Sequence, residues 1–193
     1  MEPIPALNST VNCLVVDDRR AMANLYAEWV GEKWGCRTAY GGEAAFEEIG
    51  PRTDIVLLDR EMPVRAGEDV LRSIRDGGYD VQVVMVSGVE PDVDLIDYPI
   101  DDYLEKPVDR PTLQGKVEEL LVRRTYHPTI QRYFVAVAKL ELLEETQPES
   151  ELVDDDDYLA LRATADELRQ ESNATLGSRS DHVADFTVKE SHD

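Results

Sequence analysis

The first 121 residues alternate short apolar runs with amphipathic segments, and this alternation limits the possible folds more than any other feature. Two of the runs, Ile55–Leu58 and Val81–Val86, are apolar at nearly every position. Such runs are typical of strands buried on both faces of a parallel sheet. Strands that alternate with helices pair in parallel through right-handed crossovers. The pattern therefore predicts an α/β fold with a doubly wound, five-stranded parallel sheet.

The chain changes character after Thr125. Apolar residues recur at helical spacing from Pro128 to about Glu145, and a second helical pattern runs from about Asp157 to Thr175. The acidic run 154–157 lies at the start of the second helix, where carboxylates cap a helix and favour its dipole. We predict an α-helical hairpin whose narrow apolar stripes pack on the sheet domain or on a second copy.

These observations divide the chain into four parts. They are an N-terminal extension (1–10), the α/β domain (11–124), the helical hairpin (125–176) and a flexible tail (177–193).

The 41 acidic residues outnumber the 20 basic ones, giving a net charge of −21. Neither half of the chain is basic, so DNA binding has no electrostatic support. Abundant acids with few lysines are typical of proteins in a very salty cytoplasm. No apolar stretch approaches the roughly 18 residues of a membrane span, and the N-terminus does not resemble a secretion signal. We expect a cytoplasmic protein without a membrane partner.

The chain contains two cysteines and three histidines, and neither set predicts a metal site. Cys13 and Cys36 form no CxxC motif, so we interpret both as buried small hydrophobic residues. His127, His182 and His192 lack a second ligand three or four residues away.

Several polar residues follow directly on predicted strands. Asp17 and Asp18 follow the first strand, Asp59 the third, Ser87 the fourth and Lys106 the fifth. In an open parallel sheet, ligands bind outside the carboxyl ends of the strands. If the first and third strands are neighbours, three carboxylates converge there and repel one another. A Mg²⁺ ion, which prefers oxygen ligands, relieves this repulsion.

With the carboxylate charges offset by a cation, one carboxylate can attack phosphorus and form an acyl phosphate. Asp59 is the most central candidate, and Asp17 and Asp18 then hold the metal. Lys106 supplies a cation and Ser87 a hydroxyl donor for the remaining phosphoryl oxygens.

Four motifs in order carry a family resemblance: Val15-Val16-Asp17-Asp18, Leu57-Leu58-Asp59-Arg60-Glu61-Met62-Pro63 with Gly67 eight residues after Asp59, Val86-Ser87-Gly88, and Asp102-Tyr103-Leu104-Glu105-Lys106-Pro107. Together they resemble the receiver domain of two-component response regulators over residues 11–124. The resemblance implies a flavodoxin-like sheet of order 2-1-3-4-5.

The same resemblance implies roles for individual residues. Asp59 would accept a phosphoryl group from a sensor histidine kinase, and the carbonyl of Glu61 would join Asp17, Asp18 and Asp59 around Mg²⁺. Ser87 and Tyr103 would form the switch that responds to phosphorylation. Receivers catalyse only their own phosphoryl transfer and slow dephosphorylation, so the resemblance implies a signalling protein rather than an enzyme.

The sequence departs from the receiver pattern in two places. Arg19-Arg20 follows Asp18, where such a pair could tune partner choice or bind nearby acids. Ser87 and Lys106 are only 19 residues apart, and Pro91 and Pro99 interrupt the segment. We therefore expect the fourth receiver helix to be one short turn or a loop, which puts dimerisation through it in doubt.

The stretch from Tyr126 to about Thr175 is similar to the HalX domain that follows receivers in halophilic archaea. The sequence leaves the output of this domain open among three alternatives. The hairpin binds an unknown protein partner, or it only mediates self-association in a homodimer, or it contacts DNA as part of a transcriptional regulator. Two other classes fit less well. An aspartyl-phosphate phosphatase needs Asp-x-Asp, which Asp59-Arg60-Glu61 lacks, and the acids at 17 and 18 would repel the phosphate of a flavodoxin-like redox module.

Overall fold

A computed structural model describes residues 11–91 and 93–177. The predicted N-terminal extension (1–10) and all but the first residue of the predicted tail (177–193) lie outside them. The five strands are β1 (Asn12–Val16), β2 (Gly35–Ala39), β3 (Ile55–Asp59), β4 (Gln82–Ser87) and β5 (Asp102–Glu105).

The strands form one parallel sheet in the order β2-β1-β3-β4-β5, which confirms the predicted topology. Strands β3 and β4 are buried at every position, as their apolar runs indicated. Because the register pairs Asp59 with Val86, the ends of β3 and β4 lie at the same edge. The sequence thus places its polar strand ends together.

Helices cover both faces of the sheet. The four helical segments in the first part are α1 (Arg20–Gly31), α2 (Gly42–Glu48), α3 (Gly67–Asp76) and α4 (Arg110–Arg123). Core side chains of α1 and α4 pack with one face of the strands, and those of α2 and α3 pack with the other. Between β4 and β5, the described residues 88–91 and 93–101 form only a short 3₁₀ helix, η1 (Val93–Asp97), as the segment's length and two prolines predicted.

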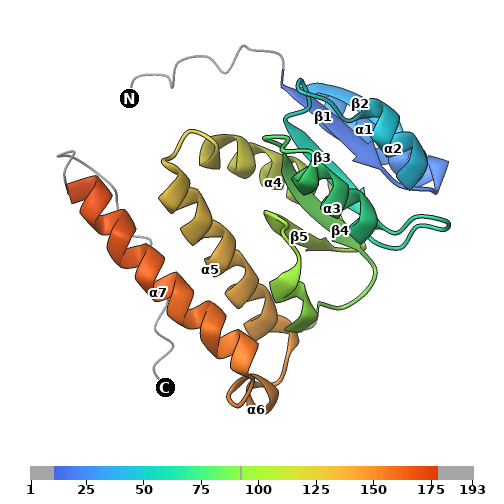
Figure 1. The fold of residues 1–193 in the computed structure, drawn as a ribbon. Coiled ribbons are helices and arrows are strands. Elements are labelled where there is room, and N and C mark those ends of the chain that lie inside the picture. The colour runs from blue at the N-terminus through green and yellow to red at the C-terminus, as the bar shows by residue number, and fades with distance from the viewer. Residues whose placement is uncertain (1–10, 92, 178–193) are drawn as a thin grey trace.

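Three helices follow α4: α5 (Pro128–Thr146), α6 (Glu149–Leu152) and α7 (Asp156–Gly177). Helices α5 and α7 lie side by side, which confirms the predicted hairpin (Figure 1). The expected loop between them contains the one-turn helix α6, which was missed because four residues carry no helical periodicity. Asp155 caps α7 by accepting a hydrogen bond from the main-chain N–H of Tyr158, at 2.8 Å.

The hairpin packs on the α/β domain rather than standing free. Helix α5 lies along β5 and η1, and α7 also contacts η1 (Figure 1). Leu143, Leu152 and Tyr158 are buried there against Val93 and Ile96. Of the two alternatives that the sequence left open, packing on the sheet domain is therefore the one found in the chain.

Two further expectations can be compared with the described residues. Cys13 is fully buried and Cys36 is half-buried, and neither is in a disulfide. Cys36 is less buried than expected because β2 is an edge strand. None of the helices described is long and apolar enough to cross a membrane.

Candidate functional site

Three carboxylates meet at the carboxyl edge of the sheet. Asp17 and Asp18 follow β1, and Asp59 is the last residue of the neighbouring strand β3. One oxygen from each of the three lies within 4.8 Å of the others. Asp17 and Asp59 are buried, with only 2% and 4% of their surfaces exposed, and Asp18 is half-buried. Three oxygen donors at this spacing fit a small divalent cation such as Mg²⁺.

Lys106 offsets part of this negative charge. Its Nζ donates to Oδ2 of Asp17 at 2.8 Å and lies 3.0 Å from Oδ1 of Asp59. The chain brings Lys106 there because its main-chain N–H donates to the carbonyl of Ser87, which continues the pairing of β4 and β5. The Lys106-Pro107 peptide bond is cis.

Neighbouring groups shift the pKa of the Asp59 carboxyl in both directions. Burial raises its pKa above the usual value, and the Asp17 carboxylate raises it further. Lys106 and the main-chain N–H of Glu61 lower the pKa by binding the charged form. The carboxylate is therefore poorly solvated by water but supported by two donors, Lys106 and the main-chain N–H of Glu61.

Ser87 and Tyr103 lie together beside this cluster. Ser87 is fully buried, and its hydroxyl accepts a hydrogen bond from the N–H of Val89 at 3.0 Å. The Tyr103 ring is buried and its hydroxyl donates to the carbonyl of Val89. Burial is the main influence on the Tyr103 hydroxyl and raises its pKa, whereas a hydrogen bond with Ser87 lowers it. Ser87 and Tyr103 thus both form hydrogen bonds with Val89, in the loop between β4 and η1.

The loop after β3 carries Glu61, whose side chain is exposed and whose main-chain N–H faces Asp59. The role of its carbonyl as a metal ligand stays a prediction. Gly67 closes the loop at the start of α3, where its N–H donates to the carbonyl of Arg60 at 2.9 Å. A Cβ at position 67 would lie 2.3 Å from the carbonyl oxygen of Asp59, so only glycine fits this close approach.

Arg19 and Arg20, which follow the acidic pair, make different contacts. Arg19 lies 3.6 Å from Asp17 through Nε, and its main-chain N–H donates to the same carboxylate at 2.8 Å. Arg20 instead stacks on the ring of Tyr40, 4.4 Å from its centroid. One member of the pair therefore binds a nearby acid, as the sequence allowed, and the other lies on the surface.

Sequence reasoning did not anticipate the environment of Arg60. Its Nε donates to Glu68 at 2.7 Å, and its Nη2 donates to the hydroxyl of Tyr98 at 3.2 Å. Nothing in the local sequence pairs residue 60 with residue 98. Only the parallel arrangement of β3 and β4, which places their following loops side by side, brings the two together.

The comparisons with known proteins agree with this arrangement. The sequence model of the response regulator receiver domain matches residues 13–118, and the HalX domain model matches residues 122–188. The chain belongs to the response regulator receiver family, and a HalX domain follows the receiver. Proteins with receiver domains act in general with a partner histidine kinase and are typically signalling proteins rather than enzymes.

Two curated relatives illustrate the range of the family. A transcriptional regulator of Haloferax volcanii is 39% identical over 167 residues, which cover 86% of this chain and 28% of that protein. The transcriptional regulatory protein CutR of Streptomyces coelicolor is 36% identical over 120 residues, or 60% of this chain and 55% of CutR. The chain thus spans about a quarter to about half of these relatives.

Solved structures show the same receiver fold. The receiver of TrrA from Thermotoga maritima, determined with Mg²⁺ and beryllium fluoride, is 30% identical with a TM-score of 0.51 and covers 57% of this chain and 98% of that one. A receiver from Methanospirillum hungatei gives a TM-score of 0.57 at 21% identity, covering 61% of this chain and 98% of that one. An acidic triad like that at 17, 18 and 59 is typical of the Mg²⁺ site of receivers.

Proposed function

We propose that the chain is a phosphorelay response regulator in which Asp59 takes a phosphoryl group from a phosphohistidine of a sensor histidine kinase. The observation that carries this proposal is the meeting of a buried carboxylate with a lysine 3.0 Å away and two further carboxylates within 4.8 Å. An oxygen of Asp59 forms the new bond to phosphorus while the bond from phosphorus to the histidine nitrogen breaks. The departing histidine nitrogen keeps the electron pair of the broken bond and takes a proton from the solvent, so the products are an aspartyl phosphate and a neutral imidazole.

Asp17, Asp18, Asp59 and the carbonyl of Glu61 would hold Mg²⁺, which offsets the charge of the carboxylates and of the phosphoryl oxygens. Lys106, already within hydrogen-bond distance of Asp17, can then turn its ammonium to a phosphoryl oxygen. The Ser87 hydroxyl is available for a second one, and its departure from Val89 would alter the loop that Tyr103 also binds.

Incubation of the full chain with acetyl phosphate and Mg²⁺ at high potassium chloride tests the proposal. We expect intact-mass spectrometry to find one added phosphoryl group on the wild type and none on Asp59→Asn. Asp69→Asn removes an exposed carboxylate on α3 and serves as the matched control, which should be labelled like the wild type. Equal labelling of Asp59→Asn would refute the assignment of the acceptor.

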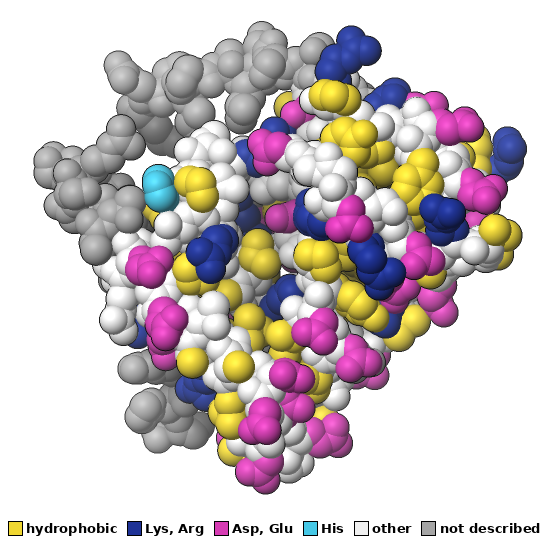
Figure 2. All heavy atoms as spheres, in the orientation of Figure 1, with side chains coloured by type: hydrophobic (Ala, Val, Ile, Leu, Met, Phe, Trp, Pro, Cys, Tyr) yellow, Lys and Arg dark blue, Asp and Glu magenta, His cyan; other side chains and the backbone are white. Residues whose placement is uncertain are grey.

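We further propose that the output runs through contact of the HalX helices with a protein partner. Residues 122–193 contain 16 acidic and 8 basic residues, and acidic side chains crowd the end of the molecule where α6 lies (Figure 2). This charge disfavours phosphate backbones at ordinary salt.

The names of the relatives favour a second candidate, DNA-linked transcriptional regulation. Gel-shift assays of the phosphorylated chain at molar potassium chloride, with a genomic fragment library, distinguish the two outputs. Retarded fragments would support the DNA output, and their absence together with partner binding would support the protein output. A hairpin that only mediates self-association would instead shift the chain to a dimer on size exclusion.

A further inference from the structure

Tyr98 lies in the connection between η1 and β5. Its side chain is bound by Arg60, the residue next to the proposed phospho-acceptor Asp59. Arg60 directly follows Asp59, and its Nη2 lies 3.2 Å from the Tyr98 hydroxyl. The guanidinium also lies over the Tyr98 ring, 5.2 Å from the centroid. Because Arg60 is largely buried and is held by Glu68 at 2.7 Å, its position follows that of the loop after β3. Tyr98 is therefore tied to the main chain beside Asp59.

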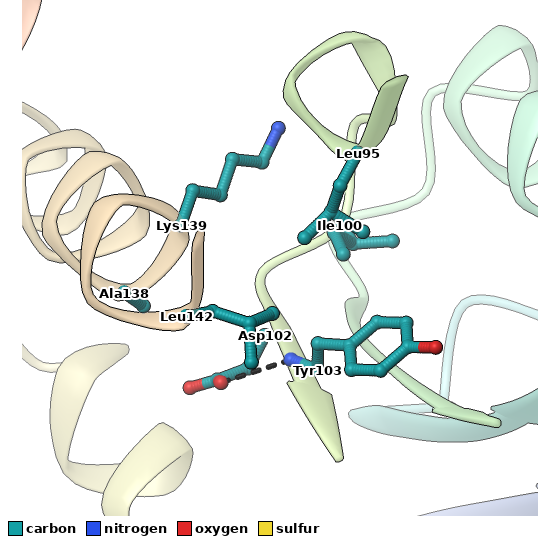
Figure 3. Close-up of a pocket in the computed structure, with 7 residues that line it drawn as sticks. All are labelled: Leu95, Ile100, Asp102, Tyr103, Ala138, Lys139 and Leu142. Carbon is teal, nitrogen blue, oxygen red and sulfur yellow. Dashed lines mark hydrogen bonds between the residues drawn. The ribbon is translucent and has the colours of Figure 1, made fainter. Parts of the chain in front are cut away.

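The main-chain carbonyl of the same residue is bound by the HalX domain. Lys139 of α5 donates from Nζ to the carbonyls of Tyr98 and Ile96, at 2.6 and 2.7 Å. Ile96 lies in the last turn of η1, where a carbonyl has no partner within the helix, and the Tyr98 carbonyl just beyond η1 also accepts from the N–H of Ile100 at 2.8 Å. Figure 3 shows the Lys139 side chain extending from α5 toward the segment that carries Leu95 and Ile100.

The burial of Lys139 indicates a specific contact rather than a chance surface pair. Burial lowers its pKa to about 8, and the nearby carboxylates of Asp97 and Asp101 only partly oppose this effect. Lysines are rarely buried unless they are paired. Here the ammonium of a half-buried α5 lysine binds two main-chain oxygens of the receiver.

The cavity beside this contact joins the same two parts of the chain. It is lined by Leu95, Ile100 and Tyr103 from the receiver and by Ala138 and Leu142 from α5 (Figure 3). Tyr103 also contacts the β4–η1 loop through its hydroxyl. The void is small, about 10 Å³, so the receiver loops and α5 are in close contact there.

We propose that Tyr98 couples the acidic site to the docking of α5, through Arg60 on one side and Lys139 on the other. The inference rests on the proposed phosphorylation of Asp59 and adds how that event reaches the HalX helices. A shift of the loop after β3 moves Arg60, which changes the position of Tyr98 and the carbonyls that Lys139 binds. This route starts at residue 60 and does not need Ser87.

Thermodynamic coupling between two sites is reciprocal. If occupation of the acidic site alters the contact of Lys139, then a change at Lys139 must alter the affinity of the acidic site by the same factor. The hydrogen bonds of Lys139 go to η1 and to the η1–β5 connection, so a direct effect on the bound phosphoryl group is not expected. A purely structural lysine would lower stability and leave that affinity unchanged.

The test measures the affinity of the full chain for beryllium fluoride in saturating Mg²⁺, by isothermal titration calorimetry. Lys139→Met removes the donors, and Tyr98→Phe removes the hydroxyl that Arg60 binds while leaving the carbonyl for Lys139. We expect each variant to change the affinity at least ~5-fold, which is the lower end of common coupling between sites. Arg132→Met, an exposed cation on the same helix, is the control and should stay within twofold.

The double variant gives a second criterion. If both residues act on one route, the combined change is clearly smaller than the product of the two single changes. Single variants that both bind like the wild type would overturn the inference while leaving the proposed function intact. A wild type that binds no beryllium fluoride would overturn both.

Amide hydrogen exchange of the wild type provides a measurement that does not depend on the folding of any variant. We expect addition of Mg²⁺ and beryllium fluoride to change the exchange of residues 93–98 and of the α5 segment around Lys139. Unchanged exchange in both segments, with binding confirmed by calorimetry, would also contradict the coupling.

Discussion

Replacement of Gly67 by alanine should damage both the stability and the chemistry of the receiver. A Cβ at this position would lie 2.3 Å from the carbonyl oxygen of Asp59 and 2.9 Å from the Cα of Arg60. Both neighbours are main-chain atoms, so no side chain can rotate to relieve the contact. Either α3 moves away from β3, or the main chain of Asp59 is displaced.

Overpacking of a filled interior costs typically 1–3 kcal/mol, and we expect about 3 kcal/mol here because the clash is with main chain. For a chain of this length that corresponds to a fall in Tm of roughly 6–12 °C. A misplacement of about 1 Å in a reacting group can lower its rate about 100-fold. Gly67→Ala should therefore also be phosphorylated far more slowly than the wild type under conditions where it is still folded.

Thermal unfolding followed by circular dichroism measures the first effect, and mass spectrometry with acetyl phosphate measures the second. Gly115→Ala is the matched control, because Gly115 is exposed in α4 and a Cβ there meets nothing within 4 Å. That variant should gain about 1 kcal/mol from its higher helix propensity. A Gly67→Ala protein as stable and as reactive as the wild type would refute the reasoning.

Three other outcomes follow from the contacts. Asp102→Asn leaves two cations of α4 without the buried carboxylate that binds them at 2.8 and 3.1 Å, and should cost about 3 kcal/mol in urea unfolding; a cost near zero would contradict this. Tyr158→Phe loses the hydrogen bond to Glu144 at 2.6 Å and should destabilise the hairpin by about 1 kcal/mol, measured as faster amide exchange in α7. Burial raises the pKa of Cys13 to about 12 and of Cys36 to about 11, so little thiolate forms at pH 8; alkylation should be slow in the native chain and rapid in denaturant, and fast native labelling would contradict the burial.

Most of the receiver could be predicted from the sequence because its signals are local. Strands β3 and β4 are apolar throughout, and the residues that follow them fix what reaches the edge of the sheet. Parallel pairing then brings Asp17, Asp59 and Lys106 together without further information. The end of β2 at Ala39 is less evident from the sequence, because Tyr40 continues the apolar pattern although its side chain is exposed.

The docking of the hairpin could not be predicted in the same way. An apolar stripe identifies which residues of α5 are buried but not what covers them. The contact with η1 includes Lys139, a residue type that sequence patterns assign to the surface. Likewise, the contact of Arg60 with Tyr98 joins residues from two loops and appears only when the strands before them are paired.

β5 forms one border of the sheet, and α5 lies against it. The border strand of a sheet is where another chain can add its own main chain. A second copy or a partner that needs this border must first displace α5, so its apparent affinity is reduced in proportion to the small fraction of molecules in which the helix is released. Assembly through β5 therefore depends on the fraction of molecules in which α5 is released as well as on protein concentration.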